Sequence, residues 1–350
     1  MAVKQVQGYT KTIKKEIIYS EKVRAEIGLK NDEKVYEDTN IKVKADLDDR
    51  PLYWARNKMQ TWLKRNPLFK DQIDFEKSLV KKGTELDNII ILFEELSRNY
   101  TGIDFSKTGN KKKVLITGFD PFILNSFKHP NIKGNILQSN PSGCVALNVE
   151  NWNIENVFVQ TLIVPVRYKD FDSSQENNNG QGKGIIEKYI GKLINEVDMI
   201  ITISQAGPKD YNIDKYATAT RGGFNDNLDF TRVANSHALI TKDEWIETTL
   251  PTEMTNAPFV KYNWTYDGKD GKNNPPKLNQ KISYGPGGSY LSNEIFYRVA
   301  KLRKDSKPKL NTGHFHIAKI QDPNEDLKSQ EIKEVIFIVK NGIKEGIKKI

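Results

Sequence analysis

The run KVLITGF at residues 113–119 is a short apolar stretch that ends in a glycine and a phenylalanine. Runs of this length, rich in β-branched residues and followed by turn residues, are typical of strands buried on both faces. Comparable runs follow along the chain: NVFVQTLIVPV (156–166), VDMIITIS (197–204), KISYG (281–285) and HFHIAKI (314–320). The pattern predicts a sheet whose strands are spread over residues 113–320.

Helical patterns lie between and after these runs. They cover residues 142–151, 183–196, 292–304 and 329–348. Strands that alternate with helices form a mostly parallel sheet, because parallel neighbours need a crossover connection and the crossover helices cover both faces. We therefore predict an α/β fold over residues 111–350, with three α/β/α layers and a mostly parallel, twisted central sheet.

The first part of the chain, residues 1–110, has a different character. It is highly charged and shows helical periodicity at Trp54–Leu63 and Phe75–Leu96. We expect a mainly helical N-terminal extension that packs on the α/β domain through the apolar stripe Ile89–Leu96. A lid, an oligomerisation arm and a partner-binding module stay open as alternatives.

Composition narrows the possible partners. The chain has 350 residues and a formal net charge of +9, but its lysines and acids are interspersed, so we expect no nucleic-acid partner. The single cysteine, Cys144, excludes an intramolecular disulfide and a cysteine-based zinc cluster. The sequence has no apolar run near the ~18 residues of a membrane span and no secretory signal at its start. We expect a cytoplasmic protein without membrane contact, although removal of a leader would give the same sequence.

Chemically active residue types follow or lie within the predicted strands. GFDPF (118–122) follows the first strand, SQAGPKDYNIDKYA (204–217) the third and GPGGSYLSN (285–293) the fourth, while HFH (314–316) lies in the fifth. Ligands of α/β sheets bind beyond the carboxyl ends of the strands. We expect these segments to meet at one rim and to bring together a hydroxyl, imidazoles, carboxylates and an amide, as an acyl-transfer site requires.

Each of these residues also has a purely structural interpretation. Ser292 is suitably placed to cap a helix at 293–304. His314 and His316 share one face of a strand, where a single histidine is commonly structural. Asp214 lies in polar sequence and suits a cap or the surface. The histidines also suggest a metal site, but HExxH and comparable ligand spacings are absent from the sequence, so we expect neither a metal nor a cofactor.

The combination of these motifs resembles the type I pyroglutamyl peptidases (pyrrolidone-carboxylate peptidases), cysteine peptidases that remove an N-terminal pyroglutamate. The resemblance runs from about Lys112 to the C-terminus and keeps the order of the family's motifs. Six segments carry it: KVLITGFDPF (113–122), NPS (140–142), SQAGPKDYNIDKYATAT (204–220), TTLPTEM (248–254), PGGSYLSN (286–293) and HFHIA (314–318).

The resemblance implies a role for individual residues. Ser292 stands at the position of the nucleophilic cysteine, His316 at that of the general base, and Asp214 at that of the glutamate that orients the base. Cys144 lies outside the nucleophile motif and does not take that role. The residues implied to line the substrate pocket are Phe119, Phe122 and Gln205.

The serine is the main departure from the family. A serine hydroxyl keeps its proton until a base removes it during attack, whereas a thiol beside an imidazole forms a thiolate. The chemistry then needs a well-ordered Ser-His-Asp triad and an oxyanion hole. Backbone N–H groups of the glycine-rich run, at Gly287 and Gly288, are candidates for that hole.

A second departure affects the substrate. The family's DARIPDN segment becomes RGGFNDN (221–227), so its pocket arginine has no aligned equivalent, and Arg221 lies two positions away. The identity of the substrate therefore stays open even where the catalytic class follows from the resemblance.

The predicted function is a hydrolase that cleaves an N-terminal pyroglutamyl or related acyl or amide group of a peptide or small amide by a Ser292–His316–Asp214 mechanism. Three alternatives stay open: a divergent, catalytically silent binding protein on the peptidase scaffold, an interaction protein whose N-terminal extension carries the role, and an engineered Cys-to-Ser enzyme. A homo-oligomer is a further expectation, because compact relatives often assemble as tetramers.

Overall fold

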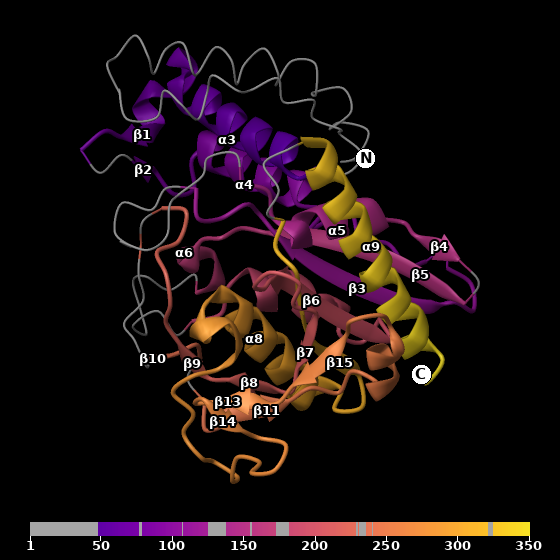
Figure 1. Ribbon diagram of the computed structural model, residues 1–350. Helices are drawn as coiled ribbons and strands as arrows, with labels where there is room; N and C mark the ends of the chain where they lie inside the picture. Colours follow the sequence, from indigo (N-terminus) through magenta and orange to yellow (C-terminus); the bar gives the residue numbers. More distant parts are fainter. Residues whose placement is uncertain are drawn as a thin grey trace.

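A seven-stranded mixed sheet forms the centre of the protein (Figure 1). The computed structural model describes residues 48–76, 79–106, 108–124, 138–154, 156–172, 182–228, 230, 236–239, 241–320 and 325–350. The strands lie in the order β12-β7-β15-β6-β3-β5-β4. Their bounds are Lys112–Phe119 (β3), Asn153–Ile154 (β4), Val157–Val164 (β5), Met199–Gln205 (β6), Asn212–Asp214 (β7), Lys261–Asn263 (β12) and Asn311–Ile317 (β15).

The four central strands, β15, β6, β3 and β5, pair in parallel. Towards the edges, β7 runs antiparallel to β15 and β4 runs antiparallel to β5, while β12 is parallel to β7. The α/β class predicted from the sequence is confirmed. The antiparallel edge pairings were not predicted, because β4 and β7 are too short to show as apolar runs.

Helices cover both faces of the sheet, and four short strand pairs form separate two-stranded sheets among the described residues. The helical segments are α3 (Arg50–Arg65), η2 (Pro67–Gln72), α4 (Glu85–Ser97), α5 (Pro141–Val149), α6 (Tyr168–Phe171), η3 (Ile186–Ile190), α7 (Gly191–Leu193), η4 (Thr252–Asn256), η5 (Pro286–Ser289), α8 (Leu291–Ser306) and α9 (Glu325–Ile347). The paired short strands are β1 (Ile73–Asp74) with β2 (Leu79–Val80), β8 (Tyr216–Thr218) with β11 (Trp245–Glu247), β9 (Thr220–Arg221) with β10 (Ser236–His237), and β13 (Thr265–Tyr266) with β14 (Lys269–Asp270).

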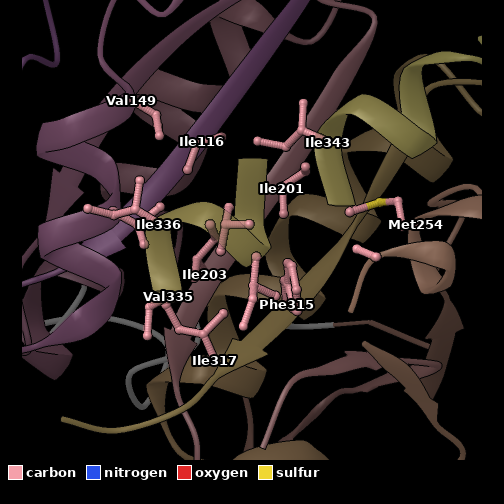
Figure 2. Close-up of a cluster of buried hydrophobic side chains, with 14 of the residues drawn as sticks. Ile116, Val149, Ile201, Ile203, Met254, Phe315, Ile317, Val335, Ile336 and Ile343 are labelled. Carbon is pink, nitrogen blue, oxygen red and sulfur yellow. The ribbon is translucent and has the colours of Figure 1, made fainter. Parts of the chain in front are cut away.

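The two faces of the sheet hold separate apolar cores, because successive residues of a strand point to opposite sides. On one face Ile116 and Ile201 pack with Val149 of α5 and Ile343 of α9 (Figure 2). On the other face α8, η3 and α6 cover the alternate residues of the same strands, such as Leu115. The sheet thus separates two helical layers. Among the described residues, every helix is too short or too polar to cross a membrane.

Two of the predicted elements differ in the structure. Residues 281–285 form no strand; Ile282 alone of this stretch is buried, among aromatic side chains of β8 and β13. The helical pattern Phe75–Leu96 yields a helix only from Glu85, because Gly83 has a φ of +75° and the side chain of Thr84 caps the helix by accepting from the N–H of Asp87. A glycine in the left-handed region followed by a threonine cap sets the start of a helix more firmly than apolar periodicity does.

Part of the predicted N-terminal extension lies outside the described residues, including 1–47. Its described part consists mainly of α3 and α4, and it packs beside the carboxyl end of β3. The expectation that the stripe Ile89–Leu96 makes this contact was wrong, because Ile91, Leu92 and Leu96 are exposed. Buried polar side chains make the contact instead, and they attach to the turn that follows β3.

Asp49, just before α3, is one of these buried polar contacts. Its carboxyl group accepts hydrogen bonds from the hydroxyl of Ser139 at 2.7 Å and from the N–H of Asn140 at 3.1 Å, at the start of α5. Burial, with repulsion from Asp48, raises the pKa of Asp49 to about 7. A carboxyl group that ionises near neutral pH makes the stability of this contact depend on pH.

We expect Asp49→Asn to flatten the dependence of stability on pH. The folded-state pKa of Asp49 lies above its unfolded value of 3.8, so its contribution is fully present below pH 4 and is lost as the pH rises through 7. Asparagine keeps an acceptor but has no charge to bury, so at pH 8 it should be more stable than the wild type by on the order of a few kcal/mol. Urea unfolding at pH 5 and pH 8 measures this. Equal losses of stability in both proteins between these pH values would contradict it.

Candidate active site

The best-defined polar contact at the rim joins His316 and Asp214. The antiparallel register of β15 and β7 pairs His316 with Asn212, which places Asp214 diagonally across from the imidazole. Nδ1 of His316 lies 2.6 Å from Oδ2 of Asp214, and the other carboxylate oxygen accepts from Nδ2 of Asn263 on β12 at 2.9 Å. Both members of the pair are buried. Asp214 therefore fixes the ring and leaves Nε2 of His316 for other contacts.

Ser292 lies beside this free nitrogen, next to Gly287. A Cβ atom placed on Gly287 would lie 2.1 Å from Oγ of Ser292 and 3.2 Å from Nε2 of His316. The serine hydroxyl and the ring nitrogen thus border the same small volume. Among the described residues, the two atoms are not joined by a hydrogen bond of 3.5 Å or less; such contacts commonly shorten only in the complex with substrate.

The interpretation of Ser292 as a helix cap was wrong. Helix α8 starts at Leu291 with Tyr290 as its N-cap residue, and no side chain caps it. Ser292 lies inside the first turn, where backbone N–H groups lack intrahelical acceptors and the helix dipole favours negative charge. A hydroxyl at this place stands near the electropositive end of the helix.

The turn before α8 has an unusual backbone. Gly287, Gly288 and Ser289 have φ values of +61°, +67° and +62° in succession. Left-handed conformations are readily adopted by glycine alone, which accounts for the two glycines. Ser289 is held in place because its Oγ accepts from the N–H of Gly285 at 3.0 Å and its carbonyl accepts from the N–H of Gly222 at 2.7 Å. The turn thus holds Gly287 close to Ser292 in a backbone conformation that favours glycine.

His314 has the structural role that a lone histidine on a strand suggests. Its Nδ1 lies 2.8 Å from Oγ1 of Thr202 and its Nε2 lies 2.7 Å from Oγ of Ser204, so both ring nitrogens are engaged. Burial, together with the nearby His316, lowers its pKa well below the usual range. Asp214, His314 and His316 have candidate metal-ligand atoms within 4.8 Å of one another. The carboxylate of Asp214, Nδ1 of His316 and both ring nitrogens of His314 already take part in hydrogen bonds with protein groups.

The two predicted pocket phenylalanines differ in position. Phe119 is buried and stacks on Phe171 at 6.3 Å between ring centroids, within the core. Phe122 is half-buried, with its ring 6.2 Å from that of Tyr290, the residue before α8. Phe122 therefore borders the start of α8, whereas Phe119 belongs to the apolar core on that face of the sheet.

The aromatic cluster around Tyr290 was not predicted from the sequence. Its ring also contacts those of Tyr168, at 5.7 Å, and Phe224, at 6.0 Å. Tyr290 had a usable signal, since it lies in the quoted PGGSYLSN motif. Phe224 had one too, since it lies in the quoted RGGFNDN segment, whereas Tyr168 comes from a distant segment whose sequence gives no such sign.

Gln205 ends β6, and its register partner on β15 is Ile317, next to His316. Its Oε1 atom is buried and has no hydrogen-bond partner among the described residues. A buried amide oxygen without a partner is costly and suits a position that accepts a hydrogen bond from a bound molecule. The role of Gln205 as a pocket residue stays a prediction.

Arg221 does not offer a free charge to the site. It is buried and pairs with Asp172 at 3.0 Å and with Glu294 in the first turn of α8 at 3.5 Å.

Asn293 was not predicted as a site residue. Its side chain accepts from the N–H of Thr218 at 2.9 Å and donates to the carbonyl groups of Thr218 and Thr220, both at 2.9 Å. Asn293 thereby anchors the start of α8, and with it Ser292.

Residues 113–258 match the family described as "PA0049, C-terminal domain". A search of curated proteins finds no match.

Among solved structures, the chain is similar to a mutant pyrrolidone carboxyl peptidase from the hyperthermophile Pyrococcus furiosus, with 17% identity and a TM-score of 0.45 over 68% of this chain and 99% of that one. It is also similar to pyroglutamyl peptidase I from Bacillus amyloliquefaciens, with 19% identity and a TM-score of 0.43 over 67% and 96% of the two chains. The pyrrolidone carboxyl peptidase from Thermococcus litoralis gives 19% and 0.43 over 67% and 94%. The activity of this chain has to be argued from its own residues.

Proposed function

We propose that the protein is a serine-dependent hydrolase that cleaves an N-terminal pyroglutamyl or related acyl group from a peptide or small amide. One observation carries the proposal: His316 is bound to Asp214 through Nδ1, while its Nε2 and the hydroxyl of Ser292 border the same volume at Gly287. A nucleophile, a base and a group that orients the base are the minimal set for acyl transfer.

In the proposed reaction, Oγ of Ser292 attacks the scissile carbonyl carbon as its proton passes to Nε2 of His316. Asp214 stabilises the imidazolium that forms. Backbone N–H groups of the Gly287–Ser292 turn stabilise the negative oxygen of the tetrahedral intermediate. His316 then gives its proton to the leaving amine as the C–N bond breaks. A water molecule, deprotonated by His316, attacks the acyl carbon, and His316 returns the proton to Oγ of Ser292 as the ester bond breaks and the acid is released.

The surroundings favour an uncharged acyl group. Phe122 and Tyr290 offer aromatic surface at the start of α8, and Oε1 of Gln205 is available to accept a hydrogen bond from a lactam N–H. Arg221 is already paired with two carboxylates and is therefore not free to bind a carboxylate substrate. A neutral ring with an N–H group, such as pyroglutamyl, fits these chemical groups.

A silent binding protein is a second candidate. The observation that favours it is the lack of a hydrogen bond between Ser292 and His316 among the described residues, because a serine needs that contact for its activation. Such a protein would still bind the acyl group through its pocket residues, but no proton would pass from Ser292 to His316.

Hydrolysis of fluorogenic amides by the purified wild-type protein tests the proposal. We expect release of the fluorophore from the pyroglutamyl amide. The alanyl amide should be cleaved at least roughly 10²-fold more slowly, because it carries a charged amine in place of the neutral lactam ring that is proposed to bind Gln205 and Phe122. Equal rates for both amides would remove the proposed specificity. A protein that binds the pyroglutamyl amide without cleaving it would support the silent alternative.

A further inference from the structure

A buried arginine of the N-terminal segment reaches the turn that follows β3. Arg56 of α3 donates through Nη1 to Oδ1 of Asp120 at 2.8 Å, and both side chains are almost wholly buried. The rest of its guanidinium group binds Ser97, with Nε 3.0 Å from the hydroxyl and Nη2 3.1 Å from the carbonyl oxygen. Arg56 thus links α3, the end of α4 and the turn in one arrangement that only a forked cation makes.

Asp120 lies between two buried cations. Its second carboxylate oxygen is 2.9 Å from Nη2 of Arg98, at the end of α4. The surrounding network alternates in sign and has as many cations as carboxylates; its members are Arg56, Arg98, Arg167, Asp120, Glu94 and Asp170. Buried charges are tolerated when paired in this way, and removal of one partner leaves another charge uncompensated.

The backbone of the same turn is held at further points. The N–H of Asp120 donates to the carbonyl of Val164 at 2.9 Å, and Nδ2 of Asn140 donates to the carbonyl of Asp120 at 2.9 Å. Nδ2 of Asn227 donates to the carbonyl of Pro121 at 2.8 Å and also approaches the hydroxyl of Tyr53 on α3 at 3.3 Å. The N-terminal segment therefore contacts both the side chain of Asp120 and the neighbourhood of Pro121.

The next residue after this turn is Phe122, whose ring lies against Tyr290 before the nucleophile helix. We propose that Arg56 is a positioning residue for the acyl pocket: by holding Asp120, it fixes Phe122 relative to Tyr290 and Gln205. The proposal rests on the proposed function and deepens it. It makes the N-terminal segment a part of the substrate site, through a residue that does not touch the reacting atoms.

The test compares two substrates in Arg56→Met. A pyroglutamyl amide depends on the pocket, whereas p-nitrophenyl acetate, a small activated ester, depends only on Ser292 and His316. Since a small displacement of a positioning group has large effects on binding and orientation, we expect the KM for the pyroglutamyl amide to rise about tenfold or more, with the rate on p-nitrophenyl acetate unchanged. Arg65→Met, at an exposed arginine of the same helix, should change neither value.

A conservative variant separates positioning from loss of folding. Arg56→Lys keeps the charge but not the fork, so it should restore part of the affinity lost in Arg56→Met. If Arg56→Met does not fold, Arg56→Lys serves as the test variant. Its KM for the pyroglutamyl amide should then be higher than that of the wild type. A parallel fall of both activities in a folded Arg56 variant, or no change in either, would overturn the proposal.

Direct binding keeps this proposal distinct from the proposed function. If the wild type cleaves neither substrate, the proposed function fails, and calorimetric binding of 2-pyrrolidone, the lactam ring alone, decides the role of Arg56. Binding by the wild type that is about tenfold weaker in the Arg56 variants supports the positioning role. Equal binding in all proteins, or no binding by the wild type, overturns it.

Discussion

Replacing His316 with alanine should lower the kcat for a pyroglutamyl amide by roughly 10³-fold or more, because the hydroxyl of Ser292 then has no base to accept its proton. The bond to Asp214 at 2.6 Å orients the ring, so His316 is the group at the rim placed to take this role. The loss should fall on kcat rather than on KM, since the imidazole acts in proton transfer and not in the binding of the acyl group. Steady-state kinetics with the fluorogenic amide measure both constants.

His314 supplies the matched control on the same strand. Its two nitrogens are bound by Thr202 and Ser204, and glutamine keeps a donor and an acceptor for these hydroxyls. His314→Gln should therefore lose much less activity than His316→Ala. If the two variants lost activity equally, or if His316→Ala kept wild-type turnover, the assignment of the base would be wrong.

The second large effect is expected from Gly287→Ala. The new methyl group would lie 2.1 Å from Oγ of Ser292 and 3.2 Å from Nε2 of His316, well inside normal contact distance of the hydroxyl. Either the turn or the serine must move, and the volume that the attacked carbonyl would enter is filled. We expect kcat/KM to fall by roughly 10²-fold or more, because displacements of about 1 Å have this effect on well-oriented sites.

Gly288→Ala is the control for backbone strain. Gly288 has nearly the same left-handed φ, so an alanine there carries the same cost of roughly 1–2 kcal/mol, but its Cβ meets no atom within 4 Å. Gly288→Ala should lose only the stability that the strain costs and keep most of its activity, whereas Gly287→Ala, which adds the steric clash, should lose at least as much stability and most of its activity. Similar activity losses in the two variants would show that strain, and not the filled volume, accounts for the effect.

Much of the fold follows from local patterns in the sequence. The central strands are continuous apolar runs that end in turn residues, and such runs are visible without knowledge of the partner strands. The run at 281–285 looks similar but carries a single buried residue, Ile282, so its strand prediction failed. The short strand β7 lies in polar sequence, because its pairing is set by its neighbours β15 and β12 and not by its own apolar content.

The residues of the candidate site that lie in recognisable sequence motifs could be predicted. Ser292, His316, Asp214 and Gly287 all lie in quoted motifs, and the structure brings these four residues together. Residues that act through long-range contacts left no local signal. Arg56 is an ordinary arginine in a charged helix, and its importance arises only because the fold buries it against Asp120, 64 residues away along the chain.

The measurement that tests the central claim most directly is hydrolysis of a fluorogenic pyroglutamyl amide by the wild-type protein beside its Ser292→Ala variant. The account predicts turnover by the wild type and a fall to background in the variant, with the fold retained. Turnover that survives in Ser292→Ala would contradict the role of the serine as nucleophile. An inactive wild type beside an active Ser292→Cys variant would contradict it too, since the pocket would then be intact and the serine silent.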